Sequence, residues 1–246
     1  MKKLLENDIK NAVLHYDNLL KYLGDLGESK VIFEKAINYH KSIADALIFT
    51  ENRGVIGIEI KTEADNLKRL KRELDSYILS CNYVFVFCHD KQLKGVLSIV
   101  KEYKYRNVGV ISYDIFEDKP IAGVVRKAEP SEYFSTKVLA SILWKKELYN
   151  ILQVWWAHQE EVVSNTYKVS KATSTQSRDL GYVRRNYNYR TLLNIFYKTF
   201  NKKQGTKIIC ELFIKNGYDP KKQLQQYHFN DDFNGDISYK KPYKRR

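Results

Sequence analysis

The chain has 246 residues, of which 43% are hydrophobic, and a formal net charge of +13. This composition excludes a disordered chain and is sufficient for one substantial core. No apolar run approaches the roughly 20 residues of a membrane-spanning helix, so we expect no membrane partner. The segment after Met1 soon turns acidic and polar, so we expect no export signal and a cytoplasmic protein.

Hydrophobic spacing predicts a helix over residues 4–23, which Gly24 ends. Three strands are then expected, separated by short turns, at residues 31–37, 43–49 and 55–61. Thr62 is a suitable N-cap, so the next helix is expected to begin there and to bury a stripe from Leu67 to Cys81.

The continuous apolar run at residues 83–88 is typical of a strand buried on both faces of a mixed or parallel sheet. A helix at about 92–104, a strand at 108–113 and an edge strand at 121–125 complete the first part. The order αβββαβαβ predicts the α/β class, with a central mixed sheet flanked by helices.

After Pro130 the strand signals end, and helices are expected at about 136–157, 188–202 and 205–216. We therefore predict two domains, 1–130 and 131–246, the second mainly helical and ending in a basic tail. The tryptophans at 144, 155 and 156 are expected to be buried against the first domain.

The net charge is concentrated in the second part of the chain. Residues 1–129 contain 21 basic and 19 acidic residues, a difference of +2, whereas residues 130–246 contain 21 and 10, a difference of +11. A basic half favours a polyanionic partner, most often nucleic acid, although a lysine-rich solvated surface would give the same count.

One predicted hairpin brings two carboxylates and a lysine together. If its turn centres on Asn52, Asp45 lies opposite Glu59 on the same face, and Lys61 shares that face two residues further on. Two adjacent carboxylates repel each other unless a cation lies between them, and Mg²⁺ or Mn²⁺ is such a cation. A metal-bound water and a lysine beside a phosphate are the parts that phosphodiester hydrolysis needs. A simple salt bridge from Lys61 to Glu59, with Asp45 facing solvent, is the alternative.

The spacing of Asp45 and Glu59-Ile60-Lys61 resembles the signature of PD-(D/E)XK nucleases. The continuation through Asp65, Leu67, Arg69 and Leu70, with Tyr77 and the strand after Tyr83, is similar to small bacterial and phage members of that superfamily. The similarity covers roughly residues 28–115. It implies a restriction-endonuclease-like core with Asp45, Glu59 and Lys61 as catalytic residues, Asp45 and Glu59 holding Mg²⁺, and DNA as substrate.

The resemblance has two departures. Ile43 stands where such proteins usually have arginine, for which Lys41 or His40 is a substitute, and Glu73 stands where they usually have glutamine. The resemblance also implies an earlier acidic metal ligand. Glu34 is the candidate, with a solvated strand residue as the alternative.

Basic and aromatic residues alternate after residue 177, a pattern that suits phosphate contacts and base stacking. The expected nucleic-acid contacts are Lys41, Arg69, Arg178, Arg184, Arg185 and Arg190. Three functions remain open: an active endodeoxyribonuclease for repair, recombination, restriction or phage DNA processing, an inactive nucleic-acid-binding protein with the nuclease fold, and a helical binding protein whose first domain only dimerises it. A homodimer would suit cleavage of both strands.

Overall fold

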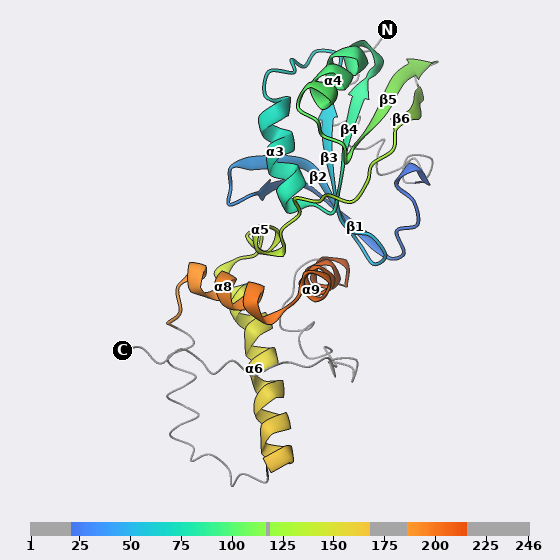
Figure 1. Ribbon diagram of the computed structural model, residues 1–246. Helices are drawn as coiled ribbons and strands as arrows, with labels where there is room; N and C mark the ends of the chain where they lie inside the picture. The colour runs from blue at the N-terminus through green and yellow to red at the C-terminus, as the bar shows by residue number, and fades with distance from the viewer. Residues whose placement is uncertain (1–20, 117–118, 168–185, 216–246) are drawn as a thin grey trace.

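The computed structural model describes residues 21–116, 119–167 and 186–215. Its centre is a six-stranded mixed sheet in the order β1-β2-β3-β4-β5-β6, which confirms the α/β class (Figure 1). The strands are β1 (Ser29–Ile37), β2 (Ser42–Thr50), β3 (Gly54–Lys61), β4 (Tyr83–His89), β5 (Val108–Phe116) and β6 (Lys119–Arg126). Most of the helix expected over residues 4–23 lies outside the described residues, and Lys21–Leu23 form a 3-10 turn, η1.

The connections explain the strand directions. Short turns join β1 to β2 and β2 to β3, and both of these pairs are antiparallel, as is the pair of β5 and β6. Helices α3 (Leu70–Ser80) and α4 (Asp90–Glu102) carry the chain over so that β3, β4 and β5 run parallel. The apolar strand β4 is buried from Val84 to His89, as expected for a strand with parallel neighbours on both sides.

The β2–β3 register is the one expected from a turn centred on Asn52. Its pairs run from Thr50 with Gly54 to Ala46 with Ile58, so that Asp45 and Glu59 are the next residues on their strands. The carboxyl end of β3 and the start of β2 therefore meet at one edge of the sheet, which is where the site is built.

The helix after β3 begins later than expected. The Asp65 carboxylate accepts hydrogen bonds from the Thr62 backbone N–H at 2.6 Å and from its hydroxyl at 2.7 Å, which closes a turn instead of capping a helix. Because residues 63–66 are exposed, they have no apolar face to pack, and α3 starts only at Leu70. Leu70, Leu74 and Tyr77 then form the buried face.

The second part of the chain is helical within the described residues: α5 (Thr136–Ala140), α6 (Lys145–Tyr167), α8 (Tyr189–Thr199) and α9 (Lys202–Ile214). The expected helix over 136–157 is broken between Ser141 and Trp144. The Glu147 carboxylate accepts from the Trp144 backbone N–H at 2.6 Å, so that α6 starts afresh at this point.

Both parts of the chain share one hydrophobic cluster. Helix α9 packs against the sheet, and its Phe213 ring stacks on Phe49 of β2 with centroids 4.0 Å apart. The secondary structure changes near residue 130 as expected, between the end of β6 and the start of α5, while the division into two domains stays a prediction.

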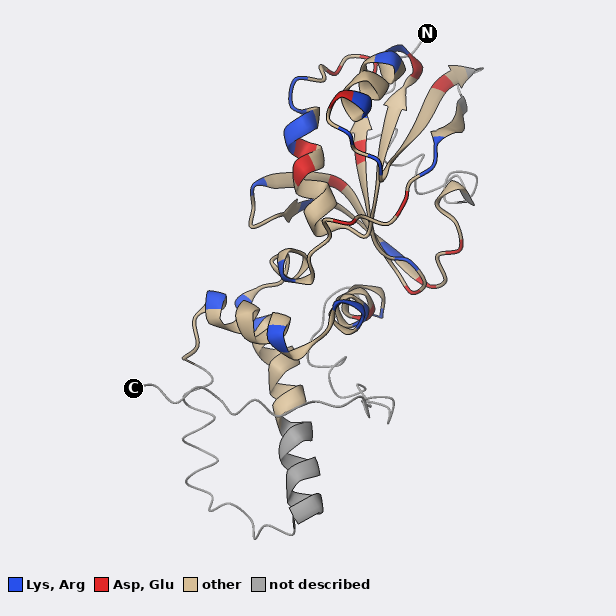
Figure 2. Ribbon diagram, viewed as in Figure 1, with Lys and Arg blue, Asp and Glu red and all other residues tan. Residues whose placement is uncertain are grey.

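Charge is distributed unevenly over these elements (Figure 2). Helix α3 has two basic residues, Lys71 and Arg72, followed by two acidic ones, Glu73 and Asp75. The charged residues of α8, Arg190 and Lys198, are both basic. No helix among the described residues is long and apolar enough to cross a membrane.

Candidate functional site

The site begins where strands β2 and β3 separate. Beyond the Ala46–Ile58 pair, the Tyr77 hydroxyl of α3 lies between the strands, accepting from the Asp45 backbone N–H and donating to the Ile58 carbonyl, both at 2.9 Å. The Asp45 carboxylate in turn accepts from the Ile60 backbone N–H at 2.7 Å. Tyr77 is fully buried, so the two hydrogen bonds of its hydroxyl hold Asp45 in place beside Glu59.

Glu59 and Lys61 are buried on the α3 side of the sheet, with only 3% and 5% of their surface exposed. Lys61 Nζ donates to Glu59 Oε1 and, at 2.9 Å, to Glu73 Oε2 of α3. Arg69, at the start of α3, brings its Nε to 3.6 Å from the other Glu73 oxygen. The structure therefore joins Asp45, Glu59 and Lys61 in one cluster, as expected, and adds Glu73 to it.

Glu59 is electrostatically strained. Burial raises the pKa of its carboxyl to about 8, and the nearby Asp45 charge adds to this effect, while Lys61 opposes it. Glu59 Oε2 is buried and makes no hydrogen bond within the described part of the chain. Such an oxygen, next to a second carboxylate, is in the environment that a bound cation would stabilise.

Lys61 is held as a cation. Burial by itself lowers the pKa of its amine, but Glu59 and Glu73 outweigh that effect and raise the pKa above its usual value. For Glu73, burial raises the pKa, and Lys61 outweighs it and lowers the pKa overall. A protonated Lys61 suits charge stabilisation or the orientation of a water, and not proton abstraction.

The residues present fit a divalent cation with few protein ligands. Asp45 and Glu59 supply two carboxylates, and the orphaned Glu59 Oε2 is the observation that favours a cation between them. No group of three or more His, Cys, Asp or Glu side chains is arranged to hold a metal among the described residues. Two carboxylates with several waters are nevertheless a usual set for Mg²⁺.

Glu34 lies at the register position that faces Asp45. The β1–β2 pairs run through Phe33 with Ala46 and resume at Lys35 with Ala44, so Glu34 falls between them. Its φ of 52° is in the left-handed region, and its side chain is exposed. Its role as a metal ligand stays a prediction.

The expected nucleic-acid contacts are spread over three elements. Arg69 lies beside the carboxylate cluster with 70% of its side chain exposed, Lys41 is exposed in the β1–β2 turn, and Arg190 is exposed on α8. Arg178, Arg184 and Arg185 lie outside the described residues. Ile43, at the position of the usual arginine, is 64% exposed.

Two roles in this cluster were not apparent from the sequence. Tyr77 was expected in the buried face of a helix and in the motif that resembles the nucleases, but neither expectation indicates that its hydroxyl joins two strands. Glu73 was expected at the rim, but its spacing of four from Arg69 and from Tyr77 could have indicated that it shares their face of α3.

Residues 1–215 match the family described as bacteriophage P4 protein cII. The chain belongs to that family. This membership indicates a phage-related protein, and it does not bear on the resemblance to PD-(D/E)XK nucleases, which remains a prediction. No curated protein and no solved structure matches the chain.

Proposed function

We propose that this cII-family protein is a metal-dependent nuclease of the PD-(D/E)XK type that hydrolyses phosphodiester bonds of DNA, in phage DNA processing, restriction, repair or recombination. The observation that carries the proposal is that the half-buried Asp45 lies beside the buried Glu59 and Lys61, and that one oxygen of Glu59 is buried without a hydrogen bond. Charged side chains in an otherwise apolar sheet have a desolvation cost, and catalytic sites are where proteins commonly retain such charges.

Each residue has a distinct part in this proposal. Asp45 and Glu59 would hold Mg²⁺ or Mn²⁺, which supplies an activated water and neutralises charge on a phosphate oxygen. Lys61, kept protonated by two carboxylates, stabilises negative charge as it develops on the phosphate. Tyr77 fixes the backbone at Asp45 and Ile58 and so sets the separation of the two carboxylates.

Cleavage of labelled linear duplex, single-stranded and branched DNA in Mg²⁺, Mn²⁺ or EDTA tests the proposal. We expect cleavage that needs metal and is lost in Glu59→Gln and Lys61→Ala. Lys71 and Asp75 form a matched ion pair on α3, with both side chains 46% exposed. Lys71→Ala and Asp75→Asn should therefore cleave normally. Metal-independent cleavage, or full activity in the site variants, would contradict the proposal.

A nucleic-acid-binding protein with little or no activity is the second candidate, and Glu73 is the observation that favours it. Its carboxylate accepts a hydrogen bond from Lys61 and so competes with a phosphate for that amine, whereas the resembling proteins usually have a neutral glutamine at this position. Glu73→Gln separates the candidates, because it should leave cleavage intact or increase it if Lys61 is catalytic. If the protein binds DNA but does not cleave it, whether residue 73 is glutamate or glutamine, the second candidate is supported.

A further inference from the structure

Trp144 was expected to be buried against the sheet domain, and this expectation is wrong. It is 68% exposed, in the short segment between α5 and α6, whereas Trp155 and Trp156 are partly buried against the core. An exposed tryptophan ring offers a flat apolar face on which the ring of a partner can stack.

Three segments that carry exposed aromatic or basic residues meet at the backbone from Ser141 to Leu143. The Tyr39 backbone N–H donates to Ser141 Oγ at 3.1 Å, and the Tyr189 hydroxyl donates to the carbonyls of Ser141 and Leu143 at 2.9 and 3.1 Å. These bonds bring the β1–β2 turn and the start of α8 to the start of α6. The aromatic–basic corner, as we name this surface, consists of Tyr39, Lys41, Trp144, Lys145, Lys146 and Arg190.

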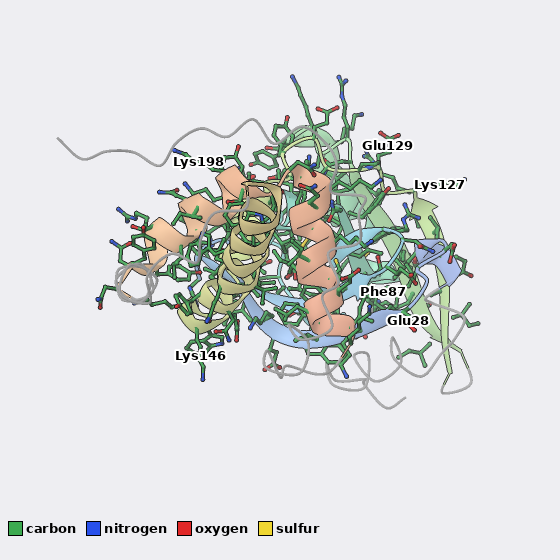
Figure 3. The ribbon with its side chains drawn as sticks, turned by 90° about the horizontal axis from the view of Figure 1, so that it is seen from below. Glu28, Phe87, Lys127, Glu129, Lys146 and Lys198 are labelled. Atoms are coloured by element: carbon green, nitrogen blue, oxygen red, sulfur yellow. The ribbon has the colours of Figure 1, made fainter. Side chains whose placement is uncertain are left out.

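The corner is positively charged. Its four lysines and arginines are exposed, and Lys146 points outward from α6 in Figure 3. Lys145 and Lys146 lie in the first turn of α6, where the helix dipole is also positive. Glu147, the carboxylate of that turn, is buried against the Trp144 backbone N–H. An anionic partner is therefore favoured.

The β1–β2 turn presents its aromatic ring in an unusual backbone conformation. Asn38, Tyr39 and His40 are three consecutive non-glycine residues with positive φ, at 48°, 56° and 65°. Asn38 is held by its side-chain hydrogen bond to Ser76 of α3, and Tyr39 by Ser141, while the Tyr39 ring stays 41% exposed. Such strained runs persist where the surroundings enforce them and are concentrated at functional sites.

The corner is connected to the carboxylate site. Ser76 receives hydrogen bonds from Asn38 at 3.3 Å and from Ser42 at 2.9 Å, and the next residue, Tyr77, holds Asp45. Tyr39 and Asp45 are six residues apart, which limits their separation to roughly 20 Å. A strand of nucleic acid lying on the corner could thus reach the site.

We propose that the aromatic–basic corner binds single-stranded nucleic acid, with bases stacking on Trp144 and Tyr39 and phosphates contacting the lysines and Arg190. Exposed aromatics beside cations are how proteins bind single strands without sequence preference, whereas the stacked bases of a duplex offer no free faces. The inference rests on the proposed function in naming the substrate class of the same site.

Binding is measured by fluorescence anisotropy of a labelled dT20 oligonucleotide with the full chain in EDTA, so that cleavage plays no part. Trp144→Ala and Tyr39→Ala should each weaken binding by about tenfold. Lys145→Gln with Lys146→Gln should reduce the log–log salt slope by about 1.4, the value for two contacts on a single strand.

Tyr103 provides the matched aromatic control. It is 42% exposed, and its ring lies 5.1 Å from Lys71 Nζ, whereas the β1–β2 turn contacts α3 at Ser76. Tyr103→Ala, and Lys94→Gln with Lys101→Gln on α4, should bind as the unaltered protein does. Circular dichroism confirms that the variants are folded.

Unchanged dT20 binding in the folded corner variants, or tighter binding to a 20-base-pair duplex than to dT20, would overturn the inference. The outcomes separate it from the proposed function. A protein that binds dT20 through the corner but cleaves no DNA refutes the nuclease and keeps the corner. If the protein cleaves DNA but the corner variants bind dT20 normally, the nuclease proposal is kept and the corner is refuted.

Discussion

The carboxylate site and the aromatic–basic corner differ in how they treat charged side chains. Glu59 and Lys61 are almost fully buried and are tied to each other and to Glu73, whereas Lys145 and Lys146 are exposed on the surface of α6. Buried charges have a large desolvation cost and must be paired, while exposed lysines cost little and attract an anion from a distance. The first arrangement suits chemistry on a bound phosphate, and the second suits capture of the strand that carries it.

The largest effect is expected from the buried charges. Glu59→Gln removes a metal-ligand charge, and Lys61→Ala removes the buried cation, so each should reduce cleavage by about 100-fold or more. Anisotropy with dT20 should change little, because neither residue belongs to the corner. A parallel loss of binding and cleavage in these variants would show that the two regions are not separable.

Removing Phe213 tests whether the helical part supports the site. Its ring stacks on Phe49 of β2, so Phe213→Ala should lower the free energy of unfolding by about 3–5 kcal/mol. Tyr197, 54% exposed on α8, is the control, and Tyr197→Ala should change stability by less than about 0.5 kcal/mol. Urea denaturation measures both. Equal, small changes would mean that α9 is not part of the folded core.

The contact between Phe213 and Phe49 makes the basic C-terminal part of the chain a structural support of the sheet. A fragment ending near residue 130 would expose Phe49 and the neighbouring core that α9 covers, so loss of DNA binding in it could reflect unfolding. Charge neutralisation in the full chain avoids this ambiguity.

Tyr77→Phe removes only the hydroxyl that joins the two strands. The Asp45 N–H and the Ile58 carbonyl lose a buried partner, and we expect a loss of about 2–3 kcal/mol in stability. Cleavage should fall by about tenfold because Asp45 is less firmly positioned. In Tyr105→Phe, the control, a hydroxyl bonded to the half-exposed Asp75 is removed, so activity should be unchanged and stability should fall less.

The smallest effect is on pH dependence. Because the folded pKa of Glu59 is raised to about 8, its ionisation in the metal-free protein opposes folding, and stability should fall as pH rises from about 4.5 through 8. Between pH 6 and pH 9 the unaltered protein should lose about 2–3 kcal/mol more than Glu59→Gln, because pH rises by roughly two units before Glu59 ionises in the folded state. Thermal unfolding in EDTA at both pH values measures this difference, and parallel curves would contradict it.

The sequence predicted the sheet well because its signals are local and periodic. The turn at Asn52 and the lengths of the flanking apolar runs were enough to place Asp45 next to Glu59. Side chains alternate between the two faces of a strand, so a shift of the register by one residue would move the apolar residues to the wrong face. The buried strand β4 was equally clear, because a run without polar positions has no solvent face.

The errors fall where side chains compete with backbone patterns. Thr62 is a good cap by type, but Asp65 takes its hydrogen bonds and delays α3 by about two turns. The Glu147 carboxylate similarly starts a new helix at Trp144, which exposes that ring. Helical periodicity predicts neither the late start of α3 nor the new start of α6. The bridge that the Tyr77 hydroxyl makes between β2 and β3 depends on the tertiary fold. These interactions shape both the carboxylate site and the aromatic–basic corner.

Calorimetric titration of Mn²⁺ and Mg²⁺ into the metal-free full chain and into Glu59→Gln tests the central claim most directly. At pH 8, we expect one ion per chain in the unaltered protein, with proton release because Glu59 must ionise to bind it. Affinity should fall by about tenfold or more in Glu59→Gln, which lacks one ligand charge. No bound ion in the unaltered protein, or equal affinity in the variant, would contradict the assignment of Asp45 and Glu59 as a metal site.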